Sequence, residues 1–115
     1  MLLNEFDYTS NDSKGILAFK QNYLVKSQAG NQPIDYPYYY TAPVNTGVDS
    51  GHDLDKDGVA SGAKGDAFGF GYYPGQYGMA ILSKYPIDMS AVRTFQLFKW
   101  NDMPDNKLVS ILDET

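Results

Sequence analysis

The pattern of apolar and polar positions predicts a strand and then a helix at the start of the chain. Residues 1–8 open on an apolar run that turns polar, as a short buried strand does. A polar stretch rich in helix N-cap residues follows. From Ile16 onward, apolar side chains recur at the spacing of one helical face. The helix is expected to end within residues 27–30, because a glycine and then a proline follow there.

Three further strands are expected, at residues 36–44, 77–85 and 92–100. The first is rich in aromatic residues and bordered by prolines, and the last shows regular alternation of its side chains. The two faces of residues 92–100 are not cleanly sorted by polarity, so both are expected to be partly covered. A helix between the first two strands indicates an α/β layered architecture. Residues 108–112 form a short apolar tail for which the pattern predicts no particular state.

The long connection at residues 45–75 is dense in glycine and aspartate. A loop of this length inside a compact domain usually carries function or a bound ion. Within it, Asp53, Asp55 and Asp57 alternate and are followed by Gly58. Carboxylates at this spacing wrap oxygen ligands around Ca²⁺, and the glycine gives the sharp turn.

The frame of an EF-hand is incomplete, because its twelfth position is Lys64 in place of a bidentate glutamate. Asp66 lies two residues later and could serve instead, with the Val59 carbonyl and Ser61 as further oxygens. A calcium loop outside the EF-hand frame is therefore one interpretation. A solvated acidic turn, in which aspartate and glycine are favoured for backbone reasons, explains the same residues equally well.

The composition restricts the classes of protein to which the chain can belong. It has 115 residues, 14 acidic and 9 basic side chains, a net charge of −5 and no cysteine. One domain is therefore expected, and disulfide scaffolds, cysteine-based zinc clusters and thiol chemistry are excluded. The acidic balance argues against nucleic-acid binding through non-specific charge alone. Apolar runs are too short for a membrane span, and 15% aromatic residues argue against disorder.

Two acidic residues, Glu5 and Asp7, lie where the first expected strand ends. α/β proteins commonly place metal ligands at the carboxyl ends of strands, and either residue could hold Mg²⁺ against a phosphate. Charged residues at strand ends are, however, more often simply solvated. The only histidine, His52, could be a ligand or a base, but a loop histidine usually faces solvent. The aromatic stretches at 36–40 and 68–73 could stack on a sugar, a base or a partner, or fill a core.

Several stretches resemble a known family. The opening LLNEFD, followed by a helix, resembles the strand of the endonuclease/exonuclease/phosphatase superfamily that carries a metal-binding glutamate. Residues 77–87, YGMAILSKYPI, resemble the G-x-A-I-L-S-(K/R)-x-P-I strand of the same superfamily. Together with PVNTGVDSG, DAFGFGYYPGQYG and RTFQLFKWNDMP, they are similar in order over nearly the whole chain to bacterial members thought to be secreted or periplasmic.

The resemblance implies a DNase I-like four-layer α/β/β/α sandwich, in which two mixed β-sheets pack face to face between helices. It also implies Mg²⁺- or Mn²⁺-dependent hydrolysis of phosphodiesters or phosphomonoesters by in-line attack of an activated water. Glu5 is the one residue that matches a catalytic position of the family, as a metal ligand. His52 does not match the family's catalytic histidine. Residues 53–57 look like an insertion of this branch, where Ca²⁺ would rigidify a loop beside the substrate groove.

Residues 1–115 are expected to be a single, partial domain of this type. The family's leading strand with its asparagine, its Asp-x-Asn motif and its terminal Ser-Asp-His motif match no part of the chain. The expected function is that of a truncated metal-dependent phosphoesterase, weak or inactive alone, whose full-length form acts on a phosphate ester or nucleic acid. An uncovered sheet face would favour homo-oligomers, and a strictly monomeric species in light scattering would contradict this.

The alternative is a non-catalytic binding or interaction module that Ca²⁺ stabilises and that uses a tyrosine-rich surface. The two interpretations differ in the residues on which metal binding depends. The first requires Glu5 for Mg²⁺ or Mn²⁺, and the second requires Asp53 and Asp55 for Ca²⁺. The calcium-type loop and the absence of cysteine favour a periplasmic or secreted location.

Overall fold

The computed structural model describes residues 1–10 and 15–107. The expected apolar tail at 108–112 lies outside these residues, as does part of the polar stretch before the helix. The regular elements are short, and long irregular connections separate them. Their bounds are β1 (Leu2–Leu3), α1 (Ile16–Phe19), the π-helical turn η1 (Lys20–Leu24), β2 (Tyr38–Thr41), β3 (Ala80–Ser83), and the 3₁₀ turns η2 (Met89–Ala91) and η3 (Trp100–Asp102).

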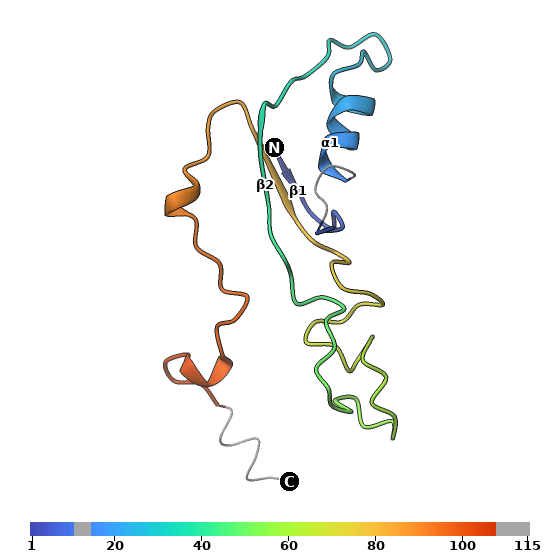
Figure 1. The fold of residues 1–115 in the computed structure, drawn as a ribbon, viewed down its shortest axis with the longest axis vertical. Coiled ribbons are helices and arrows are strands. Elements are labelled where there is room, and N and C mark those ends of the chain that lie inside the picture. The colour runs from blue at the N-terminus through green and yellow to red at the C-terminus, as the bar shows by residue number, and fades with distance from the viewer. Residues whose placement is uncertain (11–14, 108–115) are drawn as a thin grey trace.

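The three strands form one antiparallel sheet in the order β1-β3-β2, so the last of them in the sequence lies in the middle (Figure 1). Ile81 of β3 is opposite Leu2 on one side and Tyr40 on the other. The Ala-Ile-Leu sequence of β3 suits the central position, because an apolar strand is the one most easily covered on both sides. Ala80 and Leu82 are buried on one face, whereas Ile81 is exposed on the other.

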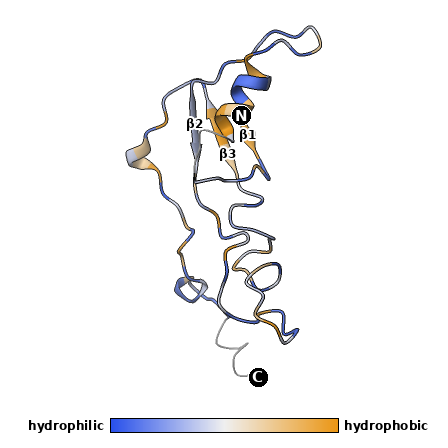
Figure 2. Ribbon diagram, turned by 45° about the vertical axis from the view of Figure 1, so that its right-hand side comes forward, coloured by the Kyte–Doolittle hydropathy of each residue, from blue (hydrophilic) through white to orange (hydrophobic). Residues whose placement is uncertain are grey.

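The core of the described residues lies between the sheet and α1, whose apolar side is next to the strands (Figure 2). Ile16, Ala80 and Leu82 are buried at its centre. The predicted helix is thus confirmed, although its N-cap is Gly15, which makes no side-chain capping hydrogen bond, and it ends at Leu24, a little earlier than expected. Within the described part of the chain, no helix has the length and apolar character that a membrane crossing requires. The residues packed around the core are Leu3, Phe6, Leu17, Phe19, Leu24, Tyr36 and Tyr39.

The strand predicted at residues 92–100 is wrong, whereas the other three are confirmed as shorter strands. This segment runs irregularly between η2 and η3, and Phe95 and Leu97 are largely exposed. Its Gln96 carbonyl accepts a hydrogen bond of 2.9 Å from the Asn45 side chain. A strand needs a neighbour that pairs with its backbone. Residues 93–96 instead line a groove on the open face of the sheet. Their side chains alternate as in a strand, but among the residues that the structure describes their backbone has no strand partner.

The described chain is elongated, and one face of its sheet is open. Its dimensions are 59 × 31 × 24 Å and its radius of gyration is 18.5 Å, whereas a compact domain of this length has a radius of about 13 Å. On the sheet face opposite α1, Leu2, Met79 and Ile81 are 61%, 56% and 45% exposed. The sheet and its helix agree with the expected α/β layering. A second sheet is not found in residues 1–10 and 15–107, so the four-layer sandwich stays a prediction.

Candidate functional site: the segment after the first strand and the aspartate loop

Glu5 lies in an irregularity of the pairing between the start of the chain and the segment that contains β3. Leu3 is opposite Ala80, and the Phe6 amide donates to the Gly78 carbonyl at 2.8 Å. The chain advances three residues from Leu3 to Phe6, whereas the facing segment advances only two, from Ala80 to Gly78. One extra residue on one strand is the arrangement of a β-bulge. The φ angle of Glu5 is 54°, in the left-handed region that glycine favours. Glu5 is thus a bulky, exposed residue held in a strained conformation.

The residue two places after Glu5 ties this segment to a turn far along the sequence. Asp7 Oδ1 accepts a hydrogen bond of 3.0 Å from the Tyr77 amide. Asp7 Oδ2 accepts a short hydrogen bond from the Tyr73 hydroxyl. We call Asp7, Tyr73 and Tyr77 the Asp7 clamp. The hydrogen bond to Asp7 raises the pKa of the Tyr73 hydroxyl above its ordinary value of 10.0.

Two glycines allow the backbones beside the Asp7 clamp to approach closely. The Tyr8 amide donates to the Gly75 carbonyl at 2.8 Å, and Gly75 has a φ angle of 93°. A Cβ on Gly75 would overlap the Tyr8 carbonyl oxygen, and one on Gly78 would lie 2.7 Å from the Phe6 carbonyl oxygen. Glycine is therefore required at both positions. The sequence predicted no function for this turn, although its Pro-Gly pair is a turn signal.

The Glu5 carboxylate is a donor of the kind that Mg²⁺ or Mn²⁺ prefers. Mg²⁺ is commonly held by one or two carboxylates, and waters and substrate phosphates complete its coordination. Glu5 is exposed and supplies one such carboxylate. It is not part of any group of three or more acidic or histidine side chains that could share an ion in the described residues. One carboxylate of this kind could contribute to such a site, and the role of Glu5 as a metal ligand stays a prediction.

The predicted calcium loop brings Asp53, Asp55 and Asp57 together. One carboxylate oxygen of each lies within 4.8 Å of the others. The Asp53 carboxylate accepts hydrogen bonds from the amides of Asp57 at 3.1 Å and Gly58 at 2.9 Å, and Asp57 Oδ1 accepts one from the Val59 amide at 2.8 Å. These bonds fold the loop but leave three like charges close together. A cation would relieve their repulsion.

Asp66 holds this loop together from outside the group of three aspartates. It is 1% exposed, and Oδ1 accepts a hydrogen bond of 2.8 Å from the Leu54 amide. Its Oδ2 accepts hydrogen bonds of 2.8 Å from both the amide and the hydroxyl of Ser61. The Ser61 amide, and next the Ser61 hydroxyl, lower the pKa of Asp66 below its ordinary value of 3.8. Asp66 therefore joins the two ends of the loop, and its role as a calcium ligand stays a prediction.

The lowered pKa of Asp66 makes the loop sensitive to acid. Because its carboxylate is favoured in the folded state, Asp66 stabilises the fold above about pH 4, and this contribution is lost as the pH falls through the lowered pKa. We expect Asp66→Asn to lower the melting temperature at pH 7 and to flatten its fall between pH 5 and about pH 2. Thermal unfolding followed by circular dichroism across this range measures both effects.

Asp88 provides the matched control for this experiment. Its pKa is also lowered, mainly by the Ser90 hydroxyl, but it lies outside the aspartate loop. Asp88→Asn should therefore leave the amide-exchange protection of Leu54 and Ser61 intact, whereas Asp66→Asn should remove it. Equal protection of these two amides in both variants would contradict the role assigned to Asp66.

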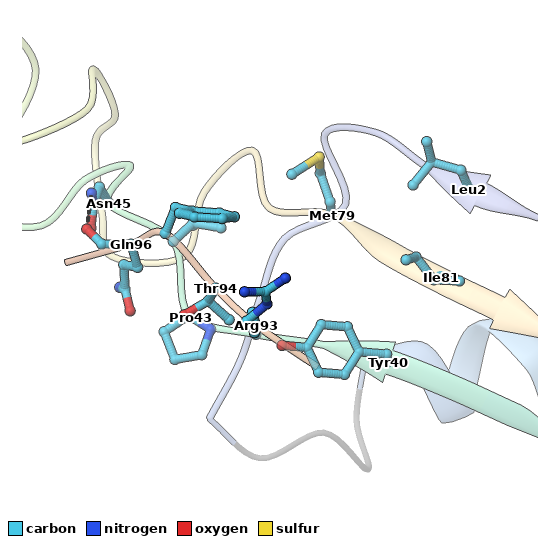
Figure 3. Close-up of a pocket in the computed structure, with 12 residues that line it drawn as sticks. Leu2, Tyr40, Pro43, Asn45, Met79, Ile81, Arg93, Thr94 and Gln96 are labelled. Carbon is cyan, nitrogen blue, oxygen red and sulfur yellow. Dashed lines mark hydrogen bonds between the residues drawn. The ribbon is translucent and has the colours of Figure 1, made fainter. Parts of the chain in front are cut away.

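A groove of 410 Å³ lies on the open face of the sheet (Figure 3). Leu2, Met79 and Ile81 contribute to it from the sheet and its approach, and residues 93–96 lie across from them. Arg93 is the one charged residue among its lining residues. Glu5 and the aspartates do not line it. The groove is therefore an apolar surface separate from the candidate metal ligands.

Comparison with known proteins identifies the family. The model of the Endonuclease/Exonuclease/phosphatase family matches residues 1–114. The chain belongs to this family. No curated protein and no solved structure matches the chain. The resemblance that rested on LLNEFD and residues 77–87 is thereby confirmed.

Members of the endonuclease/exonuclease/phosphatase family are phosphoesterase- or nuclease-like hydrolases that depend on a divalent metal. In this family member, Glu5 follows β1, whereas the aspartate loop lies at the end of the molecule away from α1 (Figure 1). The exposed His52 is not part of the aspartate group. The structure therefore separates the predicted metal ligands into two places. Sequence reasoning missed the Asp7 clamp, because its tyrosines are distant in sequence.

Proposed function

We propose that this chain is part of a Mg²⁺- or Mn²⁺-dependent phosphoesterase in which the Glu5 carboxylate is a metal ligand. The observation that supports this role is the backbone of Glu5, which holds an exposed, bulky side chain at a φ angle of 54° inside a bulge. Strain of this kind persists only where the surrounding structure enforces it, and it is concentrated at functional sites. Bulges likewise redirect side chains next to active sites.

The proposed substrate is a phosphate ester, which includes nucleic acid. A divalent cation at Glu5 would polarise a phosphoryl oxygen of the substrate and fix its orientation. The chain has a net charge of −5, so protein charge alone would not hold a polyanion, and a bridging cation is needed. The part played by Glu5 itself is to hold that cation beside the Asp7 clamp.

Cleavage by residues 1–115 alone is expected to be weak or absent. Phosphoryl transfer requires several positioned charges and hydrogen-bond donors around the phosphate. The resemblance assigns only Glu5 to a catalytic position of the family, and in the described residues Glu5 is not part of any group of three or more acidic or histidine side chains. We therefore propose that these residues form a partial domain and that the full-length protein supplies the remaining groups.

Glu5→Gln is expected to lower Mn²⁺ affinity by about tenfold or more, because the charged ligand is lost while the shape of the side chain is kept. Electron paramagnetic resonance of free Mn²⁺ measures the affinity directly. The free energy of unfolding should change by no more than about 0.5 kcal/mol, since Glu5 is exposed. Asp35→Asn, which removes one exposed negative charge elsewhere, is the matched control.

Glu5→Gly separates strain from function. Glycine adopts the left-handed region without penalty, so this variant should be more stable than the wild type by up to about 1 kcal/mol. It should also lose Mn²⁺ affinity, as Glu5→Gln does. Unchanged Mn²⁺ binding in both variants, or a destabilised Glu5→Gly variant, would contradict the proposal.

A second candidate function, a calcium-stabilised interaction module, is supported by the proximity of Asp53, Asp55 and Asp57. Under this proposal, Ca²⁺ at 100 times its Kd stabilises the fold by about 2.7 kcal/mol. We expect the melting temperature to rise with Ca²⁺, and the rise to disappear in Asp53→Asn/Asp55→Asn. Glu5→Gln should keep the full rise, because Glu5 lies outside the aspartate loop. A rise that survives the double substitution would exclude the loop as its source.

Self-association remains part of the proposal. The open sheet face exposes Leu2, Met79 and Ile81 to solvent, and the chain is far from compact. Contiguous apolar surface of this kind is unusual on a soluble monomer. We propose that a second copy of this chain covers this face, and a strictly monomeric species in light scattering would contradict this.

A further inference from the structure

The Asp7 carboxylate is engaged by the protein on both of its oxygens. The Tyr77 amide donates to Oδ1, and the Tyr73 hydroxyl donates to Oδ2. Asp7 lies two residues after Glu5 and was, on sequence alone, an equal candidate to hold a metal. Both side chains are exposed, but Glu5 differs from Asp7 in lying inside the bulge at a strained φ angle. The two carboxylates therefore have different surroundings and are expected to have different roles.

We propose that Asp7 is a positioning residue for the Glu5 carboxylate and is not itself a metal ligand. The inference rests on the proposed role of Glu5 as the metal ligand. Asp7 acts through the backbone that joins it to Glu5, because its side chain fixes the chain just beyond the bulge. Of the two carboxylates, only that of Glu5 would contact the metal.

The bulge at Glu5 needs the hydrogen bonds of Asp7 on its C-terminal side, because its N-terminal side is held by the short strand β1. β1 is only two residues long, and a left-handed conformation of a non-glycine residue costs about 1–2 kcal/mol. Beyond Glu5, the Phe6 amide bonds to the Gly78 carbonyl, and Asp7 adds the two side-chain bonds of the clamp. Without Asp7, the backbone around Glu5 is free to relax toward an ordinary extended conformation. The Glu5 side chain would then no longer be held in one orientation.

The other half of the clamp is a closed turn that can serve as a fixed support. The Gln76 amide donates to the Tyr73 carbonyl at 3.2 Å, and the Gln76 side chain accepts from the Tyr72 amide at 2.7 Å. The Tyr73 carbonyl also lies so close to Gly47 that a Cβ there would overlap it. Tyr73 is therefore fixed by backbone contacts on both sides, and its hydroxyl presents a defined donor to Asp7.

Mn²⁺ binding by matched variants tests the proposal. In Asp7→Asn, the amide oxygen can still accept from the Tyr77 amide, and the amide nitrogen can donate to the Tyr73 hydroxyl oxygen. We therefore expect Asp7→Asn to keep Mn²⁺ affinity within about threefold of the Asp35→Asn control. Asp7→Ala should lower the affinity about tenfold or more, and Tyr73→Phe should lower it by a smaller factor. Rescue by the asparagine distinguishes positioning from ligation.

Amide hydrogen exchange gives a readout that does not depend on metal. Protection of the Tyr77 amide should persist in Asp7→Asn and be lost in Asp7→Ala, since the carboxylate is its acceptor. Both measurements are made well below the melting temperature of each variant, so a loss of global stability does not imitate the result. Tyr73→Phe serves where Asp7→Ala fails to fold, because it removes only one bond of the clamp.

The outcomes separate the two proposals. If Asp7→Asn loses as much Mn²⁺ affinity as Glu5→Gln, Asp7 is a ligand and the positioning role is overturned. If Asp7→Ala keeps both the affinity and the protection of the Tyr77 amide, the clamp does not support Glu5. If Glu5→Gln leaves the affinity unchanged while Asp7→Ala still exposes the Tyr77 amide, the clamp exists but the proposed function fails, and the positioning role fails with it.

Discussion

Replacing Leu82 with alanine is expected to lower the free energy of unfolding by about 2–5 kcal/mol. Leu82 is 1% exposed, lies in the central strand and packs with Ile16 and Ala80 at the centre of a small core. Two terms add: the favourable free energy of burying the removed methyl groups is lost, and a cavity is left in the core. Urea unfolding followed by circular dichroism measures it. With so few buried residues in the described chain, this variant should be close to unfolding at 37 °C.

Ile81→Ala is the matched control for the core substitution. Ile81 is the neighbouring residue in β3, but it is 45% exposed on the open face. In a sample dilute enough to be monomeric, its replacement should therefore lower the free energy of unfolding by less, about 1 kcal/mol, because only part of its side chain is buried. Equal losses in the two variants would mean that both faces of the sheet are covered in solution, as in an oligomer.

Gly75→Ala is expected to destabilise the protein by about 2–5 kcal/mol and to release the segment after Glu5. Two effects add at this position. The φ angle of 93° is unfavourable for alanine, and its Cβ would overlap the Tyr8 carbonyl oxygen, which belongs to a paired backbone. Amide exchange of Tyr8 should become much faster, since its acceptor is the Gly75 carbonyl.

Gly30→Ala separates the two effects. Gly30 also has a positive φ angle, 80°, but nothing lies within 4 Å of the position that an alanine Cβ would take there. Gly30→Ala should therefore lower the free energy of unfolding only by the cost of a positive φ angle for alanine, about 1 kcal/mol. Similar losses in Gly75→Ala and Gly30→Ala would show that the close approach of the Gly75 turn to Tyr8 does not occur in solution.

The elements that depend on local pattern were predictable from the sequence. The recurrence of apolar residues from Ile16 located the helix, the apolar runs located β1 and β3, and the aromatic stretch bordered by prolines located β2. Residues 92–100 show where local pattern is insufficient. Their alternation is as regular as that of a strand, but pairing depends on a partner edge, and pattern alone does not supply one.

The candidate site was predictable only in part. The spacing of Asp53, Asp55 and Asp57 correctly placed three carboxylates together. The bulge at Glu5 left no local signal, because glycine, which marks such positions, is absent there. The different surroundings of Glu5 and Asp7 likewise depend on Tyr73 and Tyr77, about seventy residues from Asp7, so the sequence alone gave the two carboxylates equal standing.

The position of β3 has a consequence for synthesis on the ribosome. Among the described residues, β1 and β2 do not pair with each other, and each is joined to the sheet only through β3. Neither strand therefore has a partner until residues 80–83 have left the exit tunnel, and Leu82, the centre of the core, arrives at the same moment. The nascent chain must carry its unpaired N-terminal strands through that whole interval, a period in which a holding chaperone would protect it from aggregation.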